Sequence, residues 1–232
     1  MTVDRLPSPL AQIAWIGGAQ VAAMALWFSA TAVLPALRSE WQLTSVEAAW
    51  ITASVQVGFA LGALGSALLQ LADRFDPRRL FAAGALIGGA CTVLLATVVV
   101  DATLAIVLRF VTGVCLASVY PPGMKLAASH AAPRHRGLAI GALVGALTLG
   151  SALPHWVRYQ LADDGGSAEL PWRAVLLVSA ALAGVAALVI TFGVRVGPHA
   201  ARSAPFRWSR VGDVLRDAQL RRWQLLNCMQ ND

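Results

Sequence analysis

The sequence predicts an all-α integral membrane protein with six membrane-spanning helices. Three observations lead to this fold class. Only 13% of the 232 residues are charged, against roughly 25% in a soluble domain, and the mean hydropathy is +0.64. Six apolar runs are each long enough to cross a hydrocarbon core, which takes about 20 helical residues. Such runs form helices, because in lipid a segment must satisfy its own backbone hydrogen bonds.

The six runs make up most of the chain, and short charged segments separate them. We expect the spans at residues 11–37, 48–72, 80–100, 102–124, 137–157 and 174–194. Together they form one predicted domain, residues 1–194, which a basic tail, residues 195–232, follows. Glycine and alanine are frequent in the spans, which suits close helix packing in a solvent that gives helices no hydrophobic drive to associate.

Several helix starts can be predicted from local patterns. Thr44 and Glu47 have the spacing of a capping box ahead of the second span. Asp76 followed by Pro77 is typical of an N-cap and a first-turn proline, and this pair precedes the third span. Pro133 has a similar place ahead of the fifth span.

Pro121 and Pro122 interrupt the fourth run near one end. Proline removes a backbone donor, so the pair either permits a bend or ends the helix. Because Gly123 and Lys125 follow, the sequence favours the end of the helix at this point.

The distribution of basic residues predicts the orientation. With both termini in the cytoplasm, 14 of the 18 lysine and arginine residues fall in cytoplasmic segments and 3 in external segments, while Arg109 lies within a span. Positive charge favours the cytoplasmic side, so we expect cytoplasmic termini and a multi-pass protein of the cell (plasma or inner) membrane. The net charge of +6 then reflects topology, and nucleic-acid binding is not expected.

A compact charged turn lies between the second and third predicted spans. Five of the seven residues from Asp73 to Arg79 are charged, whereas the 25 residues before them and the 21 residues after them carry no charge. In the predicted orientation this turn is cytoplasmic, and its arginines help to keep it there.

The turn reads LQLADRFDPRR, residues 69–79, and resembles the signature loop of the major facilitator superfamily, G-x-L-a-D-R-x-G-R-R. The residues that match in kind are Asp73, Arg74, Arg78 and Arg79. Leu69 stands where the pattern has its first glycine, and Asp76–Pro77 stand where it has its second glycine and an arginine.

Two further stretches resemble elements of the same family. LRFVTGVCLASVYPPGMK in the fourth span is similar to R-F-x-x-G-x-x-x-A, through Arg109, Phe110, Gly113 and Ala117. PRHRGLAIGALVGALTLGSALP at the fifth span is similar to R-G-x-A-x-G, through Arg136, Gly137, Ala139 and Gly141. The three elements occur in the family's order and on the expected sides of the membrane.

The resemblance implies a fold of twelve spans in two related halves, each a pair of inverted three-helix repeats, with substrate bound between the halves. The chain then corresponds to the N-terminal half. The implied function is secondary active transport of a small solute by alternating access, driven by a proton or ion gradient and without a bound cofactor. The implied partners are the small-molecule substrate, membrane lipid, and either the missing C-terminal half or a second copy. The alternative is a non-transporting truncated product, or a six-span subunit that must dimerise.

The resemblance also implies a cytoplasmic gate at the charged turn, formed by Asp73, Arg74, Arg78 and Arg79. In the family the loop aspartate pairs with basic residues or a helix N-terminus of the other half, where charge and helix dipole both favour a carboxylate. The alternative is a solvated turn whose charges set the orientation and cap a helix. Leu69 weakens the gate interpretation, because a glycine there allows closer helix approach.

Arg109 is the one charged residue inside a predicted span, and such residues are functional candidates by default. It lies about seven residues from the outer end of its span, or roughly 10 Å deep at 1.5 Å per residue. That depth allows the side chain to reach the interface, so a snorkelling arginine is one interpretation. The resemblance implies a buried role instead, in proton coupling or in holding the first and fourth spans together.

A binding cavity needs polar groups at mid-depth in the membrane. The candidate lining residues are Gln20, Trp27, Gln56, Tyr120, Thr148 and His155. Each has a plainer interpretation, as an interhelical hydrogen-bonding residue or an interfacial one. No predicted span contains Asp or Glu, so the sequence offers no carboxylate as a proton carrier.

An intramembrane enzyme is not expected from these residues. The chain has neither H-E-x-x-H nor G-x-S-x-G, and no paired carboxylates within its predicted spans. The three cysteines, Cys91, Cys115 and Cys228, lack the spacing of a metal or redox site. We therefore expect no catalytic residue, metal site or bound cofactor.

Overall fold

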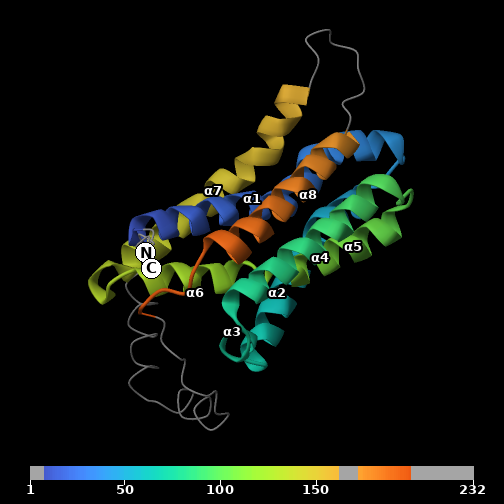
Figure 1. The fold of residues 1–232 in the computed structure, drawn as a ribbon. Coiled ribbons are helices and arrows are strands. Elements are labelled where there is room, and N and C mark those ends of the chain that lie inside the picture. Colours follow the sequence, from blue (N-terminus) through green and yellow to red (C-terminus); the bar gives the residue numbers. More distant parts are fainter. Residues whose placement is uncertain (1–7, 162–171, 200–232) are drawn as a thin grey trace, which may run out of the picture. The chain divides into compact units, whose positions relative to one another are not determined.

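The computed structural model describes residues 8–161 and 172–199, and every regular element in these ranges is helical. Six helices in the described ranges are long and apolar enough to span a membrane (Figure 1). They are Pro9–Glu40, Ser45–Leu69, Pro77–Thr97, Ala102–His130, Arg136–Gln160 and Trp172–Gly193. The predicted all-α fold class and the predicted number of spans are confirmed. The helix ends lie within three residues of those expected, except that the fourth span continues to His130 instead of ending at residue 124.

The first two helices begin at side chains that cap them. Ser8 precedes α1 (Pro9–Glu40) and accepts a hydrogen bond from the Ala11 N–H at 3.3 Å. Thr44 precedes α2 (Ser45–Leu68), where its Oγ1 accepts from the Glu47 N–H at 3.3 Å and its own N–H donates to Glu47 Oε2 at 2.9 Å. The predicted capping box is therefore present and places the start of α2.

The short helix α3 (Leu71–Arg74) and α4 (Pro77–Thr97) follow α2. Asp76 caps α4 as predicted, with its Oδ1 accepting the Arg78 N–H at 2.9 Å, and Pro77 is the first residue of the helix. Proline suits this position because its missing N–H would have no partner there in any case. Pro133 opens a 3₁₀ turn, Pro133–His135, directly ahead of α7 (Arg136–Leu161).

The fourth span consists of two helices, α5 (Ala102–Leu116) and α6 (Tyr120–His130). The expected helix end at Pro121 and Pro122 is wrong, because the chain stays helical to His130. The break lies before the prolines, at residues 117–119, and the prolines occupy the first turn of α6. First-turn residues donate no intrahelical hydrogen bond, so two prolines there begin a helix where two in its middle would end one.

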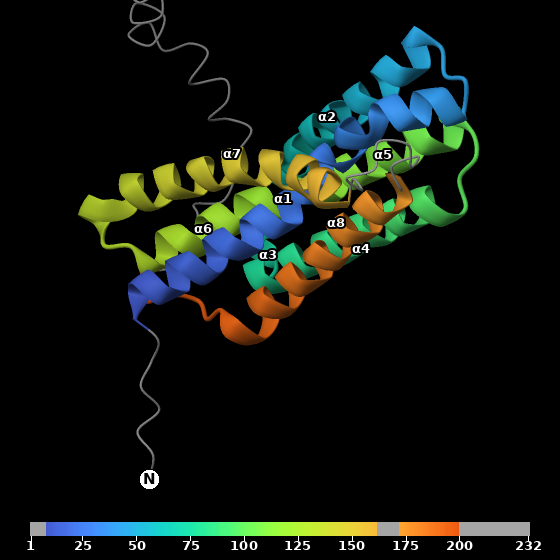
Figure 2. The same cartoon turned by 90° about the horizontal axis from the view of Figure 1, so that it is seen from above.

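The sixth span is α8 (Trp172–Leu188), which continues into a π-helical turn, Val189–Gly193. Helix α1 packs against α7 and α8, while α4 packs against α5 and α8, and α2 packs against α5 (Figures 1 and 2). The inter-helix space is filled by two apolar clusters. The first includes Ile16, Met24, Phe81, Leu116 and Leu143. The second includes Leu37, Ile51, Leu95, Val175 and Leu176.

Helices α2 and α5 approach closely because each has a glycine at the contact. A Cβ atom on Gly58 would collide with the carbonyl of Phe110, and one on Gly113 would collide with the carbonyl of Val55. The backbones therefore lie closer together than any larger residue allows. Such approach increases van der Waals contact, which is the main source of helix association in lipid.

Residues 200–232 lie outside the described residues, and with them most of the predicted basic tail. Residues 194–199 are described and follow the π-helical turn.

Candidate functional site

The side chain of Arg109 projects from α5 into the interior of the bundle, where it is 0% exposed. Its Nη1 donates to the Leu26 carbonyl of α1 at 2.7 Å, and its Nη2 donates to the carbonyl of Trp27. Its Nε has no hydrogen-bond partner among the described residues. The arginine is thus buried rather than snorkelling, and it joins the first and fourth spans.

The Arg109 site is held by neutral dipoles. Its two acceptors are consecutive backbone carbonyls, and Ser29 Oγ donates to the Leu26 carbonyl as well, at 3.0 Å. None of the three ion pairs found in the described ranges involves Arg109. A buried cation of this kind is costly to desolvate and strongly orders the groups around it.

Trp27 links the Arg109 site to the neighbouring helix. Its ring lies edge-on to that of Phe59 in α2, with centroids 4.9 Å apart and planes at 63°. Its carbonyl accepts from Arg109, so one residue of α1 contacts both α2 and α5. The indole is partly exposed, which keeps Trp27 as a candidate for lining a cavity.

The six predicted cavity residues separate into three groups by exposure. Gln56 on α2 and Thr148 and His155 on α7 are exposed, whereas Trp27 and Tyr120 are half-buried. Gln20 on α1 is 0% exposed. The structure therefore does not bring all six to one surface of the bundle.

Gln20 is enclosed by other helices of the same bundle. A Cβ atom on Gly123 of α6 would collide with Gln20 Oε1, and Phe81 of α4 lies against the same glycine. Neither amide atom of Gln20 has a hydrogen-bond partner among the described residues. Its position, between α1, α4 and α6, is that of an internal polar group.

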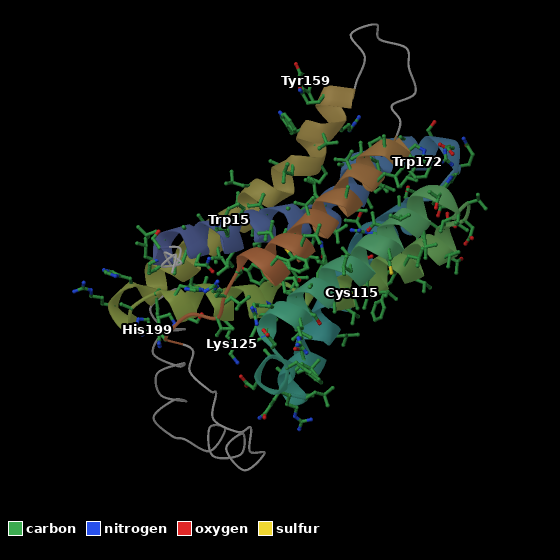
Figure 3. The ribbon with its side chains drawn as sticks, viewed as in Figure 1. Trp15, Cys115, Lys125, Tyr159, Trp172 and His199 are labelled. Carbon is green, nitrogen blue, oxygen red and sulfur yellow. The ribbon has the colours of Figure 1, made fainter. Side chains whose placement is uncertain are left out.

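The charged turn is attached to α6 of the same bundle. Asp73 forms an ion pair with Lys125, which is labelled in Figure 3, and the Nζ of Lys125 also donates to the Ala72 carbonyl at 2.7 Å. The resemblance implied a partner for this aspartate in the other half, whereas the structure provides one 52 residues further along this chain. Sequence reasoning missed Lys125 as a partner, although it is the only lysine in the chain and lies on the same predicted side.

Arg78 is engaged on two sides. Its Nε and Nη2 donate to the Asp76 carboxylate at 2.7–3.2 Å, and its Nη1 donates to the Val194 carbonyl at 3.3 Å. The hydrogen bond from Arg78 holds the pKa of the Asp76 carboxyl below its ordinary value. The other two predicted gate arginines, Arg74 and Arg79, are exposed.

The segment after α8, residues 194–199, is tied to the adjacent helix ends. Gln12 of α1 donates to the Gly193 carbonyl at 3.1 Å and accepts the Arg195 N–H at 2.9 Å. Ser129 Oγ accepts the Gly197 N–H at 2.9 Å, and the His130 ring lies 2.8 Å from the Arg195 carbonyl. No sequence pattern had singled out these three side chains.

Within residues 8–161 and 172–199, no three His, Cys, Asp or Glu side chains lie close enough to share an ion.

The most exposed spanning helices are α2 and α7, with 22% and 28% of their apolar segments buried. The other four described spans bury 44–56%, so α2 and α7 present the largest uncovered surfaces.

Two bacterial transporters are similar to the chain in sequence. The uncharacterized transporter YgaY of Escherichia coli O157:H7 is 31% identical over 179 residues, which cover 74% of this chain and 41% of YgaY. The 4-hydroxybenzoate transporter PcaK of Pseudomonas putida is 25% identical over 178 residues, which cover 77% of this chain and 37% of PcaK. The chain thus spans about two-fifths of the length of these relatives.

Two solved structures share the fold. Both are of a bacterial homolog to the human lysosomal transporter Spinster, in inward-facing form. The occupied form gives a TM-score of 0.68 at 17% identity and covers 83% of this chain and 46% of that one. The unoccupied form gives 0.67 at 16% identity and covers 87% and 46%.

The family profile extends over nearly the whole sequence. Residues 16–229 match the profile of the Major Facilitator Superfamily, a range that covers the first spanning helix from residue 16, the other five in full and most of the residues after them. The charged turn, the Arg109 element and the start of α7 are the same stretches that suggested this family from sequence. The chain belongs to the Major Facilitator Superfamily.

Proposed function

We propose that the chain is the N-terminal half of a secondary active transporter, with cytoplasmic termini, that moves a small solute across the cell membrane by alternating access. The observation that carries the proposal is the match of its six-helix bundle to 46% of a solved transporter chain. In transporters built from two repeated halves, the solute binds between them near the midplane. This bundle supplies one wall of such a site.

The uncovered surfaces of α2 and α7 support the proposal. These helices carry Gln56, Thr148 and His155, which are exposed in the bundle. A second six-helix half placed against them would cover apolar surface and enclose these polar side chains. We propose that the three residues lie at the cavity or at the boundary between the halves.

Arg109 supports movement of the bundle as one body. Its guanidinium donates hydrogen bonds to two carbonyls of α1. If α1 and α5 moved apart, these bonds would break and leave a buried cation in an apolar interior. In this proposal the whole six-helix half rocks as one body to give alternating access. Arg109 then serves to fix the position of α1 and does not bind the solute.

The charged turn is the proposed cytoplasmic gate. Its aspartate, Asp73, already pairs with Lys125 in this half. Contact with a second half must therefore share or replace the Lys125 ion pair, so the pair sets how readily the gate opens. This assigns Lys125 a part in gating that the family pattern does not include.

The proposed solute is a small organic anion or a neutral molecule, driven by a proton or ion gradient. Acidic side chains in the described spans are confined to helix ends, at Glu40 and Glu47, which disfavours a cation in the cavity. PcaK, one of the relatives, is named a 4-hydroxybenzoate transporter. An aromatic carboxylate is therefore the first solute to test.

Uptake by intact cells tests this function. Cells would make the chain together with whatever its reading frame encodes after codon 232, and would be given labelled 4-hydroxybenzoate, then neutral and cationic solutes. We expect accumulation that a protonophore or removal of the coupling ion abolishes. Failure of every solute to accumulate above the vector control, with the protein present in the membrane, would count against transport. Uptake by the chain alone, with dimers on cross-linking, would favour the six-span subunit.

A further inference from the structure

A groove of about 390 Å³ lies between the first turns of α1 and the corner that joins α6 to α7. Its walls combine apolar side chains, including Leu10, Ile13 and Leu138, with the rings of His130 and His135. We propose that this groove binds an anionic phospholipid, with an acyl chain against the apolar wall and the phosphate at the basic corner. The proposal is independent of transport, because it needs neither a solute nor a second half.

The apolar wall is open to the surroundings. Leu10 is 79% exposed and Leu138 is 77% exposed, although both belong to helices that span a membrane. Leu10 is the second residue of α1 and Leu138 the third residue of α7, so both lie at helix ends, where acyl chains meet headgroups. A lipid chain is the apolar partner available to every membrane protein at this depth.

One lining residue of the groove, His135, lies between Arg134 and Arg136 in the chain, and we call these three consecutive basic residues the rim of the groove. Arg134 and His135 are exposed, and none of the three takes part in an ion pair within the described ranges. The Nε of Arg136 is buried without a partner there, and its Nη2 makes one long contact, 3.4 Å, with the His199 carbonyl. The guanidinium therefore has donors available for a phosphate.

Described acidic residues do not neutralise this rim. At this end of the bundle, Asp73 pairs with Lys125 and Asp76 with Arg78. The remaining described acids, Glu40, Glu47 and Asp101, lie at the opposite helix ends, since each follows or precedes a complete span. Basic pockets between spanning helices favour anionic headgroups.

The combination of the two surfaces selects the occupant. A free phosphate would use the basic rim and leave the apolar wall uncovered. A zwitterionic lipid would use the wall but bring a cationic amine to the rim. An anionic phospholipid matches both, because its headgroup has no compensating positive charge.

Spin-labelled lipids test the proposal directly. The full chain would be reconstituted in phosphatidylcholine with trace spin-labelled phosphatidylglycerol or phosphatidylcholine, and electron spin resonance would measure the motionally restricted fraction of each. We expect the wild type to select phosphatidylglycerol. The double variant R134Q/R136Q should lower that selectivity by roughly fivefold for each arginine removed, and so by up to about thirtyfold, given the usual contribution of a basic residue at a membrane surface.

The matched control removes two arginines from the same end of the bundle but outside the groove. R74Q/R79Q changes the net charge equally, and both arginines are exposed. It should leave the selectivity at the wild-type value. An equal loss in both double variants would reduce the effect to general surface charge and overturn the site, as would full selectivity in R134Q/R136Q.

A second variant fills the groove without changing charge. Ala142 lines the groove and is exposed, so A142W should reduce the restricted phosphatidylglycerol fraction, whereas A152W, on the exposed surface of the same helix outside the groove, should not. Displacement of the labelled lipid by inorganic phosphate would overturn the lipid in favour of a free-anion site. Dimers that A142W disrupts, without any lipid selectivity, would assign the groove to a second copy.

Discussion

Arg109 brings a charge into the interior of the bundle and satisfies it with two backbone carbonyls of α1. An isolated cation in such a place destabilises the fold unless its donors are occupied, and here Nε has no described partner. Burial of Arg109 is therefore unfavourable for folding at this position. The role that we assign to the residue is to hold α1 in a fixed position against α5.

Replacing Arg109 with leucine distinguishes its role in positioning α1 from its effect on the stability of the fold. R109L removes the buried charge and retains apolar volume, so the free energy of unfolding should stay unchanged or rise by about 1–4 kcal/mol. Uptake by the assembled transporter should fall to background. The matched control is R158L, because Arg158 also donates to an α1 carbonyl, that of Ala32 at 3.1 Å, but is only partly buried. Wild-type uptake by R109L would refute the assigned role.

Asp76 gives a prediction about pH. Its pKa is lowered in the folded protein by the hydrogen bond from Arg78, so its ionised form favours folding above the unfolded pKa of about 3.9. That contribution is lost as pH falls through the lower, folded pKa. The difference in thermal midpoint between wild type and D76N should be constant above about pH 5 and shrink below about pH 4. A difference that grows on acidification would contradict this.

The helices owe their contacts to small residues at particular places. Gly58 and Gly113 allow α2 and α5 to touch, whereas Gly65, also on α2, has open space around it. Composition predicted close packing in general, but which glycine lies at a contact depends on helix rotation and neighbours. These follow from the assembled bundle and cannot be read from the run of apolar residues.

Alanine should have different consequences at Gly58 and at Gly65, two of the three glycines of α2. G58A forces its Cβ into the Phe110 carbonyl and should lower the free energy of unfolding by about 1–3 kcal/mol. G65A meets nothing within 4 Å and should be neutral or slightly stabilising, because alanine favours helix. Thermal unfolding in detergent measures both. Equal effects would show that the α2–α5 contact is looser than described.

Hydrogen bonds from neighbouring helix ends also hold the segment after α8, residues 194–199. Ser129 Oγ holds the Gly197 N–H, so S129A should raise the hydrogen-exchange rate of that amide by roughly twofold to tenfold. S151A is the matched control, since Ser151 Oγ donates only to its own helix, at the Thr148 carbonyl. Unchanged exchange at Gly197 in S129A would mean that other contacts hold the segment.

At the scale of the whole molecule, features formed by residues close in the sequence could be predicted, whereas contacts between residues far apart in the sequence could not. Thr44 and Glu47 lie within one turn, so their capping box could be predicted and is present. The family loop marked Asp73, but its partner Lys125 lies 52 residues away, and Arg109 and Leu26 are 83 apart. Such pairs depend on how the helices are arranged. Pro121 and Pro122 were misassigned because a proline pair marks a helix start and a helix end equally well.

The bundle leaves α2 and α7 largely uncovered, and the chain spans only about two-fifths of the length of the relatives. Both observations fit a protein in which this chain forms one wall of a solute site. A channel could also be built from such helices, but it would not expose its site to one side of the membrane at a time. The difference between the two is kinetic and can be measured.

Counterflow in sealed proteoliposomes is the most direct test of alternating access. Vesicles with the assembled transporter are loaded with unlabelled solute and diluted into a trace of labelled solute without a gradient of the coupling ion. A carrier returns with labelled solute after each outward trip, so the label should accumulate transiently above its equilibrium level and then decline. A label that rises steadily to equilibrium without overshoot would contradict the account.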